Sequence, residues 1–158
     1  MSNPSSPVSS PVVVSTDQTP PVLRAFGDEV TLLLGGAQTG GKLSLWTEVV
    51  PPGGGPPPHR HLREDEWFIV QEGTFSFFVS GEWRELGPGG AAFMPRESVH
   101  TFKNTGSTPG KLLIGTSPAG FETFFGRCAE EFSRESGPDM GRIMVIAGEH
   151  GIEFEPTA

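Results

Sequence analysis

Residues 53–73 have the sequence Gly-Gly-Gly-Pro-Pro-Pro-His-Arg-His-Leu-Arg-Glu-Asp-Glu-Trp-Phe-Ile-Val-Gln-Glu-Gly. His59 and His61 stand two residues apart in a segment with strand character, so their side chains point to the same face. Glu66 follows five residues after His61. The chain contains four histidines, and two of them lie here. The stretch is therefore the first candidate for a metal site.

A third imidazole, His100, follows a second strand bounded by Gly and Pro. Three imidazoles and one carboxylate form a suitable ligand set for one divalent transition metal ion, namely Fe, Mn, Ni, Co, Cu or Zn. Glu66 is a better ligand than Glu64 or Asp65, because it begins an apolar strand in which an unpaired charge would be costly. Glu64 and Asp65 are expected to form a solvated turn. The alternative is that His59 and His61 are surface residues beside a Pro-rich loop.

Composition limits the class of protein. With 158 residues the chain is long enough for one domain with a buried core. The net charge of −8 argues against nucleic acid and anionic membranes as partners. No signal peptide and no membrane helix is visible in the sequence, and the single cysteine, Cys128, favours a reducing, cytoplasmic setting. Residues 1–20 are rich in Ser, Pro and Thr and are expected to form a disordered tail.

Short alternating runs between turn residues predict an all-β domain over residues 21–158, with a barrel at about 25–117. Helices are expected in the region 120–158, at Phe121–Arg134 with an apolar face packed outside the barrel, and at Asp139–Glu149. Residues 152–155 are a strand or a packing arm. The predicted strands are Val30–Leu34, Leu43–Val50, His59–His61, Glu66–Gln71, Thr74–Val79, Glu82–Leu86, Ala91–Met94, Val99–Asn104 and Lys111–Thr116.

Strand alternation sharpens the candidate site. The step from His61 to Glu66 is odd, so a straight strand would place the two on opposite faces, and the segment 62–65 must bend. Glu66 then shares its face with Phe68 and Val70, and His100 shares its face with Phe102. Phe68, Val70 and Phe102 are therefore predicted to line the cavity and to bind a small-molecule substrate.

The spacing of these residues resembles the two motifs of the cupins. The first motif matches Gly53, His59, His61, Glu66 and Gly73, and the second matches Gly89, Pro95, His100 and Asn104. The resemblance departs at Glu97, where the family usually has Gly two residues after the Pro. Because Glu tolerates a positive φ poorly, the departure puts the local turn in question.

The resemblance implies a small single-domain cupin, a jelly-roll β-barrel whose metal is held by His59, His61, Glu66 and His100. The sequence of residues 55–61 and 66–73 resembles that of the quercetin 2,3-dioxygenase-like branch of the family. That likeness implies a metal-dependent dioxygenase of a flavonol-like or enolic small molecule, with Glu66 also acting as the catalytic base. Related small barrels commonly pair, so a homodimer is expected.

Two other functions fit the same ligands. One is a non-oxidative metal-dependent isomerase or lyase, and the other is a non-catalytic metal cupin that binds a small molecule. The apolar residues expected around the metal favour an aromatic or enolic ligand over a sugar phosphate, which needs inward Lys or Arg. Lys103 and Arg60 point outward by alternation.

Overall fold

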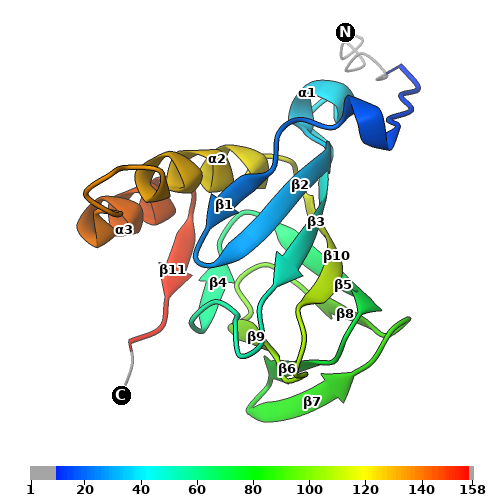
Figure 1. Cartoon of the computed structure of the whole chain (residues 1–158), viewed down its shortest axis with the longest axis vertical. Helices are drawn as coiled ribbons and strands as arrows, with labels where there is room; N and C mark the ends of the chain where they lie inside the picture. Colours follow the sequence, from blue (N-terminus) through cyan, green and yellow to red (C-terminus); the bar gives the residue numbers. More distant parts are fainter. Residues whose placement is uncertain (1–9, 157–158) are drawn as a thin grey trace, which may run out of the picture.

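Two antiparallel β-sheets face each other in the computed structural model, which describes residues 10–156 (Figure 1). The larger sheet has the order β1 (Leu23–Ala25), β2 (Asp28–Leu34), β3 (Ser44–Val50), β10 (Gly110–Ser117), β5 (Asp65–Glu72) and β8 (Ala91–Met94). The smaller sheet has the order β11 (Ile152–Phe154), β4 (His59–His61), β9 (His100–Asn104), β6 (Phe75–Val79) and β7 (Glu82–Leu86). The helices are α1 (Gly36–Thr39), α2 (Phe121–Phe132) and α3 (Met140–Glu149), with a 3₁₀ turn at Thr16–Gln18.

The all-β jelly-roll prediction is confirmed, because the chain alternates between the two sheets and most predicted strands appear within two residues of their expected limits. Alternation explains the packing. In β3, every second residue from Ser44 to Val50 is buried, and Trp46 is 1% exposed. The inner faces of β5, β6 and β9 add Phe68, Phe77 and Phe102 to the core between the sheets.

Tight turns join the strands with the residue conformations that hairpins require. Ser80 and Gly81 both have positive φ between β6 and β7, as do Phe26 and Gly27 between β1 and β2. Glu97 also has a positive φ of 69°, so this chain keeps the turn without the usual glycine. The backbone N–H of Glu97 donates to the carbonyl of His61 at 2.7 Å. The turn after β8 is therefore attached to the strand that carries two of the candidate ligands.

The two longer helices lie side by side at one end of the sheets (Figure 1). Asp139 caps α3 by accepting a hydrogen bond from the backbone N–H of Arg142 at 3.1 Å. Glu122 connects the start of α2 to α1 and to the larger sheet, because its carboxylate accepts hydrogen bonds from the Gly36 N–H of α1 at 2.6 Å and from the Ser44 hydroxyl of β3. Ile152–Phe154, for which a strand or an arm was expected, pairs with β4 as a strand.

Residues 1–9 of the predicted tail lie outside the described part of the chain, and the residues from Ser10 to Pro20 are mostly exposed around their 3₁₀ turn. Within residues 10–156, no helix combines the length and the apolar character needed to cross a bilayer. The homodimer expected from the sequence stays a prediction.

Candidate metal centre

Both sheets contribute to one group of four buried side chains. His59 and His61 lie on β4, with Arg60 between them pointing outward to Glu153. His59 stands directly opposite His100 in the pairing of β4 with β9. Glu66 comes from β5 in the facing sheet. The cluster therefore forms only when the two sheets close on each other.

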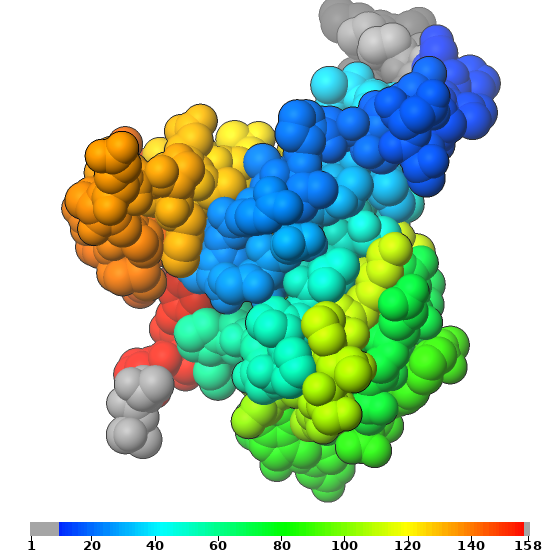
Figure 2. All heavy atoms as spheres, in the orientation of Figure 1, coloured from blue at the N-terminus to red at the C-terminus, as the bar shows by residue number. Residues whose placement is uncertain are grey.

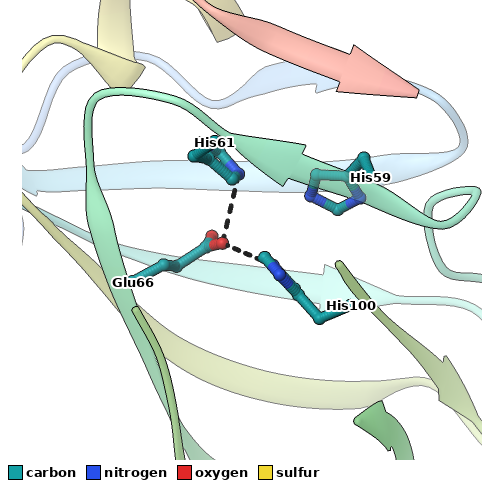
Figure 3. A group of neighbouring side chains, drawn as sticks. All are labelled: His59, His61, Glu66 and His100. Carbon is teal, nitrogen blue, oxygen red and sulfur yellow. Dashed lines mark hydrogen bonds and ion pairs between the residues drawn. The ribbon is translucent and has the colours of Figure 1, made fainter. Parts of the chain in front are cut away.

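The four residues offer ligand atoms that all lie within 4.8 Å of one another (Figure 3). Glu66 Oε2 lies 3.2 Å from His61 Nε2 and 3.0 Å from His100 Nε2. All four side chains are buried, with exposed fractions between 2% and 8%. Among the described residues, this is the group of His, Cys, Asp and Glu whose geometry allows it to hold a metal ion.

Backbone carbonyls orient two of the imidazoles. His59 Nδ1 lies 2.8 Å from the carbonyl of Pro57, and His100 Nδ1 lies 3.0 Å from the carbonyl of Ser98. A carbonyl only accepts, so each contact requires the proton on Nδ1. The Nε2 of His59 then has a free lone pair, and the Nε2 of His100 faces Glu66 Oε2 at 3.0 Å. Metal-binding histidines are usually held in this manner. The donor set therefore fits a divalent transition metal.

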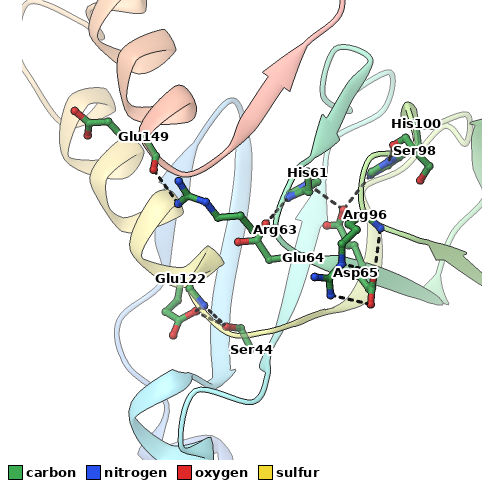
Figure 4. Close-up of polar contacts among 12 residues, drawn as sticks. Ser44, His61, Arg63, Glu64, Asp65, Arg96, Ser98, His100, Glu122 and Glu149 are labelled. Carbon is green, nitrogen blue, oxygen red and sulfur yellow. Dashed lines mark hydrogen bonds and ion pairs between the residues drawn. The ribbon is translucent and has the colours of Figure 1, made fainter.

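Glu64 lies beside the imidazole of His61. The solvated turn that the sequence analysis expected for Glu64 is therefore wrong. Glu64 is 7% exposed, and its Oε2 is 3.5 Å from His61 Nδ1 (Figure 4). Both His61 nitrogens and Glu64 Oε2 are buried without hydrogen-bond geometry to a partner in the described structure. Buried polar atoms in proteins are usually hydrogen-bonded, so buried nitrogens without a partner are expected where they coordinate a metal cation. Asp65 does remain at the surface, paired with Arg96.

The predicted bend between His61 and Glu66 is confirmed, with the chain turning at residues 62–64. The C-terminal region holds it in place. The N–H of Leu62 donates to the Gly151 carbonyl at 2.8 Å, and Arg63 donates to the Glu149 carbonyl at 3.0 Å (Figure 4). The end of α3 thus supports the segment that resets the register.

The pKa values of Glu66, His59 and His61 are shifted in different directions. Burial opposes ionisation of Glu66, but the charge of His61 and then the contact with His100 hold its pKa below the usual range. Burial lowers the pKa of His59 to about 4, so its imidazole is neutral at neutral pH. Burial also disfavours the charged form of His61, but the carboxylates of Glu66 and Glu64 outweigh it and raise its pKa to about 10. A carboxylate and neutral imidazole thus stand ready as ligands, and His61 must release its proton to a metal.

The cluster opens into a cavity of about 280 Å³ whose walls are largely aromatic. His59, His61 and Glu66 face it, and so do Phe68 and Phe102, as expected from alternation. Val70 lies on the same side of β5 and is 1% exposed within the core, but it is not among the described residues that line the cavity. Its predicted contact with a substrate is thus not supported by its position.

Sequence reasoning missed the part of the wall built by the C-terminal helix. The apolar face of α2 does more than pack outside the barrel, because Phe121, Phe124 and Phe125 line the cavity. Phe26, at the tip of the β1–β2 hairpin, packs edge-on against Phe125 with ring centres 6.3 Å apart. Figure 2 shows this hairpin lying directly against α2 at the surface. The helical spacing of the α2 phenylalanines predicted an apolar face on the helix, but no local sequence signal indicated which surface that face covers.

Two further carboxyl groups, Asp28 and Glu48, also line the cavity and were not predicted as site residues. Alternation in Leu43–Val50 did contain a signal for Glu48, since it shares the buried face with Trp46 and Val50. No alternation pattern indicated that Asp28 is buried, because Asp28 directly follows a turn, where charged residues are usually exposed.

Comparison with known proteins agrees with this architecture. Residues 46–115 match the family described as "Cupin domain". The chain is 28% identical to Protein SchB of Streptomyces halstedii over 128 residues, which cover 80% of this chain and 91% of that protein. A structure described as a predicted oxalate decarboxylase from Thermotoga maritima aligns with a TM-score of 0.62 at 22% identity, over 68% of this chain and 99% of that one.

A structure described as an RmlC-like cupin from Shewanella frigidimarina aligns with a TM-score of 0.60 at 23% identity, over 72% of this chain and 96% of that one. At these identities the structural likenesses concern the fold. The family match over residues 46–115, the two facing sheets and the buried His, His, Glu and His side chains agree with one another, and the chain has the jelly-roll fold of the cupins.

Proposed function

We propose that this protein is a cupin that acts as a metal-dependent dioxygenase on a flavonol-like or enolic small molecule. The observation that carries the proposal is the position of the ligand cluster at an aromatic-lined cavity. None of the described residues that line the cavity is a lysine or an arginine. A phosphorylated substrate would find no Lys or Arg side chain there to bind its phosphate, whereas a flat, mostly apolar molecule matches the walls.

The metal would be held by His59, His61, Glu66 and His100, and it would supply Lewis acidity and a place for substrate oxygen and O2 to meet. Glu66 is ionised at neutral pH because its partners depress its pKa, so its carboxylate can take a proton from a substrate hydroxyl at Oε2. The carbonyls of Pro57 and Ser98 keep His59 and His100 in their ligand orientation.

The cavity walls have a second role in this proposal. Phe68 and Phe102 are 1% and 5% exposed and flank the cluster, with Phe68 6.1 Å from the His100 ring centre. Phe121 lies 5.7 Å from the His61 ring centre. Rings at these positions hold a planar substrate and reduce the access of water to a deprotonated enol, which strengthens electrostatic interactions at the site.

The test begins with the metal content of protein purified without added metal, followed by reconstitution with each of the six ions. Oxygen uptake is then measured with flavonols, with simple enols and without substrate. Substrate-dependent oxygen uptake supports the dioxygenase. Substrate isomerisation or cleavage without oxygen uptake would contradict the dioxygenase and identify an isomerase or lyase. Substrate binding without turnover would identify a non-catalytic cupin.

Two variants assign the residues. Glu66→Gln should abolish turnover while retaining part of the metal, because an amide can ligate but cannot act as base. Joint replacement of His59→Ala and His61→Ala should remove the metal. If metal content were unchanged in the joint variant, the site would be wrongly placed. The matched control is Arg60→Ala, on the opposite face of the same strand.

A further inference from the structure

The second polar feature of the cavity is the pair Asp28 and Glu48, which lies on the larger sheet. Glu48 stands opposite Val30 in the pairing of β3 with β2, so Asp28, two residues before Val30, is its diagonal neighbour on the same face. Each side chain is only 6% exposed. Two carboxyl groups are thus held together inside an aromatic cavity that also contains the candidate metal ligands.

The partners of these carboxyl groups are unequal. Glu48 Oε2 accepts a hydrogen bond from the indole N–H of Trp46 at 3.1 Å, and the Glu48 and Asp28 carboxyls are within hydrogen-bonding reach of each other. Asp28 Oδ1 is buried and has no hydrogen-bond partner in the described structure. One acceptor atom of a residue that lines the cavity therefore remains unpaired.

Protonation follows from the same environment. Burial, and then the charge of Asp28, raise the pKa of Glu48 well above its ordinary value, which favours its protonated form. Burial raises the pKa of Asp28 to about 6, against which a hydrogen bond from Glu48 acts. Glu48 is thus the donor of the pair, and Asp28 is the acceptor.

A purely structural role does not explain the pair. No lysine or arginine among the described residues lines the cavity to compensate the charge, and a buried acceptor without a partner costs stability. Apolar side chains of similar size would fill the same space without that cost. We therefore expect a carboxyl group that disfavours folding and faces a cavity to form its hydrogen bond with a ligand that binds in the cavity.

We propose that the Asp28 carboxylate accepts a hydrogen bond from a neutral hydroxyl group of the ligand, and that Glu48, itself held by the Trp46 indole, keeps Asp28 in place for it. This rests on the proposed function for the use of the cavity. The ligand class is then defined at both ends. It is a small, flat molecule with an enolic oxygen pair for the ligand cluster and a separate hydroxyl group for Asp28.

The test uses two metal-chelating hydroxypyranones that differ by one hydroxyl group. Kojic acid carries a hydroxymethyl group where allomaltol carries a methyl group, and both chelate through the same oxygen pair. Their dissociation constants are measured calorimetrically on the metal-loaded full chain. Kojic acid should bind roughly tenfold more tightly, which corresponds to one hydrogen bond to a charged acceptor. In the double variant Asp28→Leu and Glu48→Met, this ratio should fall to about one.

A matched control is Glu29→Gln, which removes a neighbouring carboxylate that is half exposed and paired with Arg24 at the surface. It should keep the tenfold ratio. A second measurement is the thermal unfolding of the metal-free proteins. The double variant should unfold at the same or a higher temperature than wild type, because two buried carboxyls have been replaced by apolar groups.

Three results would overturn the inference. Equal binding of the two pyranones by wild type would show that Asp28 does not recognise the hydroxyl. A lower unfolding temperature for the double variant would assign the pair a structural role. Loss of one metal equivalent in that variant would identify the pair as a cation site. Failure of flavonols to drive oxygen uptake bears on the proposed function alone, since the pyranone ratio needs no turnover.

Discussion

Phe121 of α2 stacks on Trp46 of β3, with ring centres 4.6 Å apart and an angle of 12° between the ring planes. Trp46 in turn donates to Glu48. This contact therefore connects the C-terminal helix, the larger sheet and the carboxyl pair in the wall of the cavity. The helix is part of the site, because it supplies Phe121, Phe124 and Phe125 to the aromatic wall of the cavity.

Replacement of Phe121→Ala should destabilise the protein by about 1–3 kcal/mol, because a partly buried ring and its stacking on Trp46 are lost. It should also weaken the binding of flat ligands by enlarging the cavity. Urea unfolding and ligand titration measure the two effects. Phe93→Ala is the control, since Phe93 is 61% exposed and should change neither by much. Equal effects of the two substitutions would contradict the role of α2 in the cavity wall.

Glu64→Gln should reduce metal affinity by roughly 10- to 100-fold, because the carboxylate beside His61 Nδ1 orients that imidazole and increases its basicity. Competition with a chromophoric chelator measures the affinity. Glu153→Gln removes a carboxylate that pairs with Arg60 on the outer face of β4 and should leave metal affinity unchanged. The hypothesis fails if both variants bind metal as wild type does.

Glu97→Gly should stabilise the protein by about 0.5–1 kcal/mol, because Glu97 has a φ of 69°, a conformation that costs little only for glycine. The loss of conformational freedom in the folded glycine offsets part of that gain. Chemical denaturation provides the comparison. Glu82→Gly, at an exposed position in strand β7, should have the opposite sign. A destabilised Glu97→Gly variant would show that the carboxylate has a contact of its own.

Asp28→Asn should become more stable relative to wild type as the pH rises from about 4 to 7. The folded pKa of Asp28 is raised from 3.8 to about 6, so between these values the unfolded chain has released a proton that the folded protein retains. The stability of the folded protein therefore falls with rising pH, and the penalty is complete above pH 6. It should amount to about 1–3 kcal/mol.

Urea unfolding at pH 4, 5, 6 and 7 measures this difference. Glu48, Glu66, His59 and His61 also face the cavity and titrate in both proteins, so subtraction isolates Asp28 and its coupling to Glu48. A difference that does not vary with pH would show that Asp28 has an ordinary pKa in the folded protein.

Strand positions and the ligand group were predictable because their signals are local. The alternation of β4 places His59 and His61 on one face, and Gly or Pro at the turns marks the limits of the strands. The bend after His61 followed from parity alone. The strand β1 and the short helix α1 were not predicted, because three or four residues contain too little periodicity to identify an element.

The environment of Glu64 was not predictable, since a charged residue in a bend is usually solvated. Arg63 binds the end of α3 and Leu62 binds Gly151, which turns the bend inward beside His61. Likewise, the helical spacing of Phe121, Phe124 and Phe125 identified an apolar face without its partner. Contacts between residues far apart in the chain decided both outcomes.

The sequence by itself determined the strands and the bend, because side-chain alternation and turn conformations depend on neighbouring residues. The set of four ligands followed from the resemblance to the two cupin motifs. Only the tertiary structure decided what surrounds those ligands: the helix α2 over the cavity, Glu64 beside His61, and the carboxyl pair of Asp28 and Glu48. These features depend on how the two sheets and the C-terminal helices pack, and burial there changes the chemistry of each carboxyl group.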